Sequence, residues 1–214
     1  MLKFQQQFLD FCIHRGVLKF GEFTLKSGRV SPYFFNAGLL NTGEDLDALG
    51  DFYAQAITHA EIDFDVLFGP AYKGIPLAAI TVGSLYRKFN LNKPYAFDRK
   101  EKKDHGEGGQ IVGAEVKGNI LIIDDVITAG TAIRQSMQLI QSFGAHVSGV
   151  TIALDRQEKG QGEQSAIQEL EQLGIRVIPI IKLADIMSYL ESKGDSRQLE
   201  SVQHYRKLYG ITSA

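Results

Sequence analysis

The chain has 214 residues, with 23 Lys and Arg residues against 25 Asp and Glu residues, and a formal net charge of −2 at pH 7. This length suits one sizeable domain that buries its core without disulfides or a structural metal. The charge excludes a general nucleic-acid binder, and we expect neither a nucleic-acid nor a membrane partner. Its single thiol, Cys12, cannot form an internal disulfide, so we expect a cytoplasmic protein.

The first quarter of the chain predicts two helices separated by a hairpin-like element. The first helix carries one apolar stripe and is expected to end at Gly16. Two short β-prone runs, 20–25 and 33–35, flank the turn 26–29, which carries two cations. A second amphipathic helix is expected over 46–60.

From residue 65 onward, short apolar strands alternate with helices. The expected strands are 65–69, 95–98, 120–124, 147–155 and 175–181, with helices at 75–89, 131–143 and 164–173 and two more at the C-terminus. This alternation predicts an α/β fold with a central, mainly parallel sheet and helices on both faces. In such sheets ligands bind beyond the carboxyl ends of the strands. Residues 99–118, dense in charge and glycine, are expected to form one long loop.

The strongest motif lies at the end of the strand 120–124. Four apolar residues precede Asp124 and Asp125, and a loop of small residues then leads to a helix beginning near Thr131. Free N–H groups at a helix start bind a phosphate monoester, and adjacent carboxylates accept hydrogen bonds from sugar hydroxyls or act on a divalent cation. The alternative is an ordinary helix capped by Thr128 or Thr131 beside two solvated carboxylates. The paired aspartates favour a site for a phosphorylated sugar.

This motif ends without Gly-Lys-Ser/Thr and lacks G-x-G-x-x-G, so it is neither a P-loop nor a dinucleotide fingerprint. It resembles the phosphoribosyl-pyrophosphate (PRPP) loop of the type I phosphoribosyltransferases. The resemblance implies that Asp124 and Asp125 face the ribose hydroxyls as catalytic residues and that the following loop holds the 5-phosphate. The implied PRPP contacts in this segment are Asp124, Asp125, Val126, Ile127, Thr128, Ala129, Gly130, Thr131 and Ala132.

A second segment suits a pyrophosphate. Gly69 and Gly74 allow close approach of the backbone to a ligand, and Lys73 adds a cation at the same sheet edge. Taken alone, the segment is equally compatible with a turn bearing a surface lysine. It resembles the family's pyrophosphate loop, which implies that Tyr72 and Lys73 contact PRPP and that a non-prolyl cis peptide occurs at Ala71-Tyr72.

The charged run 98–109 is, taken alone, most typical of a solvated loop, although cations followed by glycines also suit a mobile lid over a polyphosphate. It resembles the flexible catalytic loop of the orotate-using branch of the family, which reaches into the neighbouring subunit's site. The resemblance therefore implies a homodimer. It also implies PRPP contacts from Arg99, Lys100, Lys103 and His105, with Lys103 stabilising the leaving group as a catalytic residue.

Further residues suit a flat anionic base. Phe34 and Phe35 offer aromatic faces, Lys26 a cation, and Arg156 a fork for a carboxylate. Without a family, adjacent aromatics are more often core. Segments 25–36 and 154–160 resemble the orotate-using branch, which implies orotate contacts from Lys26, Phe34, Phe35, Thr128 and Arg156, and a PRPP contact from Lys26 as well.

The resemblance implies transfer of phosphoribosyl from PRPP to N1 of orotate, with Mg²⁺ held mainly through PRPP and water and no direct protein ligand. It implies one domain over 1–214, with hood elements from about 1–40 and a flexible loop at 99–110. The rivals are a PRPP-sensing regulator and an enzyme for adenine or another base. The 22 glycines exceed the roughly 15 of average usage. Six of them lie in the three loops: Gly69, Gly74, Gly106, Gly108, Gly109 and Gly130.

Overall fold

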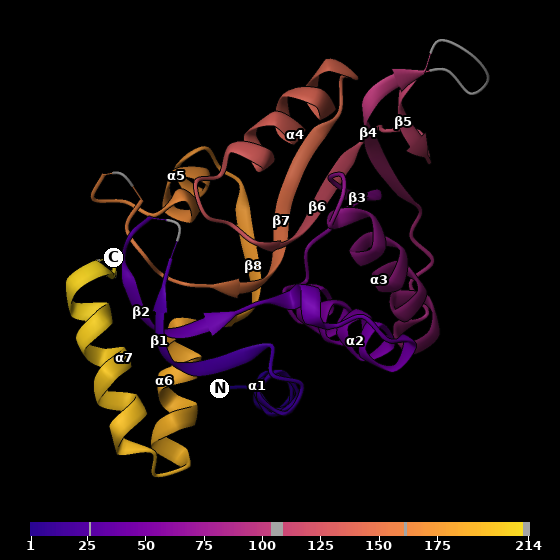
Figure 1. The fold of residues 1–214 in the computed structure, drawn as a ribbon. Helices are drawn as coiled ribbons and strands as arrows, with labels where there is room; N and C mark the ends of the chain where they lie inside the picture. The colour runs from indigo at the N-terminus through magenta and orange to yellow at the C-terminus, as the bar shows by residue number, and fades with distance from the viewer. Residues whose placement is uncertain (26, 104–108, 161, 212–214) are drawn as a thin grey trace.

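The computed structural model describes residues 1–25, 27–103, 109–160 and 162–211, and for 101–103 and 109 it describes the backbone alone (Figure 1). None of the helices in these ranges is long and apolar enough to cross a membrane. The elements are α1 (Lys3–His14), β1 (Leu18–Thr24), β2 (Val30–Phe35), a 3-10 turn (Ala37–Leu39), α2 (Gly43–His59), β3 (Val66–Gly69), α3 (Gly74–Phe89), β4 (Tyr95–Lys103), β5 (Gly109–Gly113), β6 (Asn119–Val126), α4 (Thr131–Ser142), β7 (His146–Asp155), α5 (Ala166–Gln172), β8 (Arg176–Lys182), α6 (Leu183–Ser192) and α7 (Ser196–Tyr209).

Six strands form the central sheet in the order β5-β4-β3-β6-β7-β8. All neighbours in this sheet are parallel except β4 and β5, which are antiparallel. The predicted mainly parallel sheet with helices on both faces is therefore confirmed (Figure 1).

Side chains of β6 alternate between two hydrophobic cores. Ile120 and Ile122 pack with buried residues of α4 and α5 on one face of the sheet. Leu121 and Ile123 point to the other face, where the core also contains residues of α1, α2, α3, α6 and α7. Because β6 buries both of its faces, its sequence is a continuous apolar run rather than an alternating one.

The chain reverses its direction of winding between β3 and β6. These strands are neighbours, yet α3, which follows β3, packs on one face and α4, which follows β6, packs on the other. Helices that diverge in this way leave a crevice at the carboxyl ends of the two strands, where ligands of open α/β sheets bind. The fold thus places the loops after β3 and β6 side by side.

The prediction of one long loop over 99–118 is wrong for the residues described. β4 continues to Lys103, and β5 (Gly109–Gly113) returns antiparallel to it, with Asp98 opposite Ile111. Figure 1 shows this ribbon standing out from the body at the upper right. Residues 104–108, which belong to the expected flexible loop, lie outside the described residues.

β1 and β2 form a separate two-stranded antiparallel sheet, as the hairpin-like pattern predicted. Lys26 in its turn lies outside the described residues. Arg29 donates to the carbonyls of Lys159 and Gly160 at 3.0 and 3.3 Å, so the hairpin is attached to the segment that follows β7. The chain after α7 joins the same segment, because the Ile211 N–H donates to the Gln157 carbonyl at 3.0 Å.

Candidate active site

The start of α4 has the geometry of an open anion-binding site. Its N-cap is Gly130, with a φ of 71°, and no side chain caps the helix. The first N–H groups of a helix have no intrahelical partner, and they carry partial positive charge. The alternative of a helix capped by Thr128 or Thr131 is therefore wrong, and the small-residue loop leaves these donors to a ligand.

The two aspartates at the end of β6 are not solvated carboxylates. Asp125 is only 7% exposed, and its Oδ2 lies 2.6 Å from the Nζ of Lys73. Lys73 comes from the loop after β3, so this ion pair spans the two diverging strands. The structure thus brings together the cation of the expected pyrophosphate loop and a carboxylate of the expected ribose site.

Asp124 lies beside this pair in a partly buried position. Burial raises the pKa of its carboxyl from 3.8 to about 6, although the Asp125 N–H, which donates to Asp124 Oδ1 at 2.8 Å, opposes the shift. The Tyr53 hydroxyl of α2 donates to the backbone carbonyl of Asp124 at 2.8 Å. This fully buried tyrosine anchors the end of β6 from the helix layer, and sequence reasoning missed it.

The loop after β3 is compact. The peptide bond Ala71-Tyr72 is cis, as the resemblance implied. A Cβ on Gly74 would lie 2.7 Å from both the Gly69 carbonyl carbon and Pro70 Cδ, so only glycine fits there without a shift of the backbone. The Gly74 N–H closes the loop by donating to the Pro70 carbonyl at 2.9 Å.

β4 holds this loop from its other side. The Lys100 Nζ lies 4.7 Å from the ring centroid of Tyr72, so two expected PRPP-binding residues meet. Asp98 Oδ1 accepts a 2.6 Å hydrogen bond from the Ala71 N–H. Asp98 was not predicted as a site residue, although its place at the end of a predicted strand was the available signal. Arg99 is half-buried; the side chain of Lys103 and all of His105 lie outside the described residues.

The expected base-binding residues lie on β2 and just after β7. Phe34 is 40% exposed and stacks on Phe23, with ring centroids 5.5 Å apart, whereas Phe35 packs partly against the core. Arg156 follows β7, whose Leu154 lies opposite Val126 of the phosphate loop, and it therefore belongs to the same sheet edge.

Arg156 is held by a carboxylate and a tyrosine. Its guanidinium lies 4.7 Å from the Tyr33 ring centroid, and its Nε donates to Glu158 Oε1 at 2.8 Å. Burial lowers the pKa of this guanidinium, but Tyr33 and Glu158 raise it, and the net direction is upward. Neither Tyr33 nor Glu158 was predicted to support the site.

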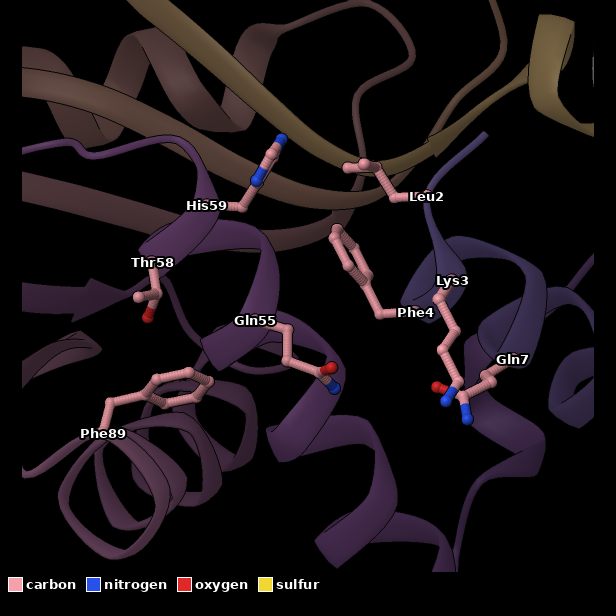
Figure 2. A pocket seen from close by; sticks show the side chains of 8 residues that line it. All are labelled: Leu2, Lys3, Phe4, Gln7, Gln55, Thr58, His59 and Phe89. Carbon is pink, nitrogen blue, oxygen red and sulfur yellow. The ribbon is translucent and has the colours of Figure 1, made fainter.

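In the part of the chain that the structure describes, no group of three or more His, Cys, Asp or Glu side chains could hold a metal ion. A pocket of about 390 Å³ lies between α1, α2 and α3 (Figure 2). It contains His59 and Phe89, which end the helices leading into β3 and β4, so it lies at the amino ends of the strands and outside the candidate site.

Comparison with known proteins identifies the family. Residues 38–174 match the model described as phosphoribosyl transferase domain. Orotate phosphoribosyltransferases of Shewanella oneidensis and Pseudoalteromonas translucida are 59% and 61% identical over 213 residues, covering 99% of this chain and 99% and 100% of theirs. The crystal structure of the orotate phosphoribosyltransferase of Francisella tularensis is 45% identical with a TM-score of 0.89, covering 95% of this chain and 99% of that one. The edge formed by the ends of β4, β3, β6 and β7 is thus found in a chain that belongs to the orotate phosphoribosyltransferase family.

Proposed function

We propose that this sheet edge transfers the phosphoribosyl group of PRPP to N1 of orotate, forming orotidine 5′-monophosphate and pyrophosphate. The observation that carries the assignment is the 2.6 Å pair between Lys73 and Asp125, next to the open start of α4. This pair supports the proposal because it brings a cation, a carboxylate and an uncapped helix start to one edge of the sheet, as the binding of a phosphorylated sugar requires.

PRPP spans this crevice. Its 5-phosphate takes the N–H groups of the loop 126–132, and its ribose hydroxyls donate to Asp124 and Asp125. Tyr72, Lys73, Arg99 and Lys100 contact the pyrophosphate. As the bond from C1 of the ribose to pyrophosphate breaks, negative charge grows on the leaving group and positive charge on the ribose, and the fixed cations and carboxylates stabilise both.

Mg²⁺ belongs to the proposal as the partner of PRPP. When bound, Mg²⁺ would supply charge neutralisation at the pyrophosphate, and it would be held mainly through PRPP and water because this ion gives up its water shell reluctantly. Asp124 and Asp125 are carboxylates of the type that accept hydrogen bonds from such water. This arrangement is supported by the hydrogen bond that Asp125 Oδ2 accepts from Lys73, because that oxygen is already occupied and is not free to be a metal ligand.

The base lies between the hood and the segment after β7. Arg156 binds the orotate carboxylate through its guanidinium, and the exposed face of Phe34 packs on the ring. Lys26, Phe35 and Thr128 complete the orotate contacts. A neutral purine has no carboxylate to accept from the guanidinium N–H groups that Glu158 leaves unused, which favours orotate over adenine.

The proposal includes a homodimer in which the ribbon β4–β5 delivers Lys103 and His105 to the neighbouring subunit's site. What supports it is that the ribbon stands out from the body (Figure 1) and that Tyr72, which Lys100 of the ribbon contacts, is 68% exposed. A cytoplasmic location is also proposed, supported by the single, buried thiol of Cys12.

The test is release of pyrophosphate from PRPP and Mg²⁺ in the presence of orotate or adenine. We expect release with orotate only. Release with adenine would show that the base substrate is adenine rather than orotate. No release with either base would favour the alternative that the protein is a PRPP-sensing regulator.

A further inference from the structure

Glu158 carries a partly buried carboxylate to which the proposed reaction assigns no role. Its side chain is 13% exposed, and its Oε1 accepts hydrogen bonds from Arg156 Nε at 2.8 Å and from the Tyr33 hydroxyl at 3.1 Å, and also lies 2.7 Å from Arg156 Nη2 in an ion pair. Among the described residues, Glu158 also forms an isolated β-bridge with Gly210. Both its backbone and its carboxylate are therefore fixed.

These contacts orient the guanidinium of Arg156. A guanidinium offers five N–H donors in one plane, and Glu158 occupies the edge formed by Nε and Nη2. The Tyr33 ring covers one face at 4.7 Å, and Ser31 Oγ accepts from Nη2 at 3.4 Å. Within the ranges that the structure describes, Nε and Nη2 make these hydrogen bonds, and Tyr205 also interacts with Arg156 and Glu158. A ligand carboxylate is thereby offered the edge that carries Nη1.

Glu158 orients Arg156 and so strengthens the binding of a ligand carboxylate, but it also has an effect that weakens this binding. Its charge lies close to the guanidinium and repels a second carboxylate brought there by a ligand. Fixing a side chain with several rotatable bonds in its binding orientation removes an entropic cost from ligand binding. Because the bonds to Glu158 are short and shielded from water, we expect the orienting effect to be the larger one.

We propose that Glu158 is a positioning residue for base specificity: together with Tyr33, it holds Arg156 so that the enzyme prefers a base that carries a carboxylate. The inference rests on the proposed binding of the orotate carboxylate by Arg156. It explains why the hood strand β2 and the segment after β7 are joined at the same guanidinium.

The readout is the preference of the protein for orotidine 5′-monophosphate over uridine 5′-monophosphate, measured as the ratio of their dissociation constants by calorimetry. The two nucleotides differ only by the base carboxylate, so loss of folding or of phosphate binding does not change the ratio. We expect Glu158→Gln to reduce the preference by about tenfold. Tyr33→Phe, which keeps the ring and removes one bond to Glu158, should reduce it less, in the same direction. Because Tyr33→Phe leaves Glu158 in place, it also tests the proposal if Glu158→Gln fails to fold.

The matched control is Glu115→Gln, which makes the same change in an exposed pair with Lys117 and should leave the ratio unaltered. Arg156→Gln tests the binding of the orotate carboxylate by Arg156 separately from the positioning role of Glu158. If it leaves the preference intact, the proposed role of Arg156 is wrong. If it abolishes the preference while Glu158→Gln and Tyr33→Phe preserve or increase it, only the positioning role is overturned.

Discussion

Asp124 is a carboxyl group that the fold makes harder to ionise, since burial raises its pKa from 3.8 to about 6. Below pH 3.8 the carboxyl is protonated in both the folded and the unfolded state. As the pH rises from 3.8 to 6, the unfolded chain ionises while the folded chain keeps the proton, so the free energy of unfolding falls by up to about 3 kcal/mol and stays constant above pH 6. Asp124→Asn should therefore be more stable than the wild type at pH 8, with the difference vanishing near pH 3. Urea unfolding at the two pH values measures this, and a gain that is equal at both would contradict it.

Lys103 is proposed to act on the departing pyrophosphate. Lys103→Ala should lower kcat by about 100-fold, in line with the loss of one transition-state contact, while the KM for orotate changes little. Steady-state kinetics with orotate varied at saturating PRPP separates the two parameters. Lys103→Arg, which keeps the charge, serves as the control and should lose less. An unchanged kcat in Lys103→Ala would remove this residue from the mechanism.

At the residue scale, the site residues that could be predicted are those marked by their neighbours in the sequence. Asp124 and Asp125 follow a buried strand directly, and this position alone marked them. Tyr53 reaches Asp124 across 71 residues, and Asp98 reaches Ala71 across 27. Such supporting contacts form only when segments distant in the sequence pack together, so no local sequence pattern predicts them.

At the scale of elements, the loop after β3 depends on two glycines that touch. Gly74→Ala would place a Cβ 2.7 Å from the Gly69 carbonyl carbon, and the backbone must move to admit it. We expect a raised KM for PRPP and a loss of about 1–3 kcal/mol in unfolding free energy, typical of overpacking. Gly43→Ala, at the start of α2 with open space around it, is the matched control and should alter neither quantity. Steady-state kinetics and urea unfolding of both variants measure these quantities. Equal changes in the KM for PRPP and in the unfolding free energy for the two variants would contradict the packing argument.

The core elements were predictable because each has its own periodicity, whereas the ribbon β4–β5 was not. Its charged residues and glycines are typical of a loop, yet the backbone of 98–103 pairs with 109–111 as an edge hairpin. Edge strands often carry charged side chains, and in this ribbon Ile111 is an apolar residue packed against the core. Local composition therefore concealed a pairing that depends on a partner strand.

For the whole molecule, sharing of the ribbon between subunits predicts complementation. A Lys103→Ala chain and an Asp125→Asn chain should each have little activity alone. When they are mixed, unfolded and refolded together, a mixed dimer would contain one intact site, and about a quarter of the wild-type activity should return. Refolding each variant by itself is the control. Mixed samples no more active than these would show that each subunit uses its own ribbon.

The hydrogen bond from Ile211 to Gln157 gives the C-terminus an unexpected importance for engineering. Any tag or fusion partner appended to this end emerges within a few residues of the segment that carries Arg156 and Glu158. We therefore expect a bulky tag at this end to weaken the contact between Ile211 and Gln157, next to Arg156. Labels and immobilisation chemistry are better placed at the start of α1, whose pocket lies at the opposite edge of the sheet.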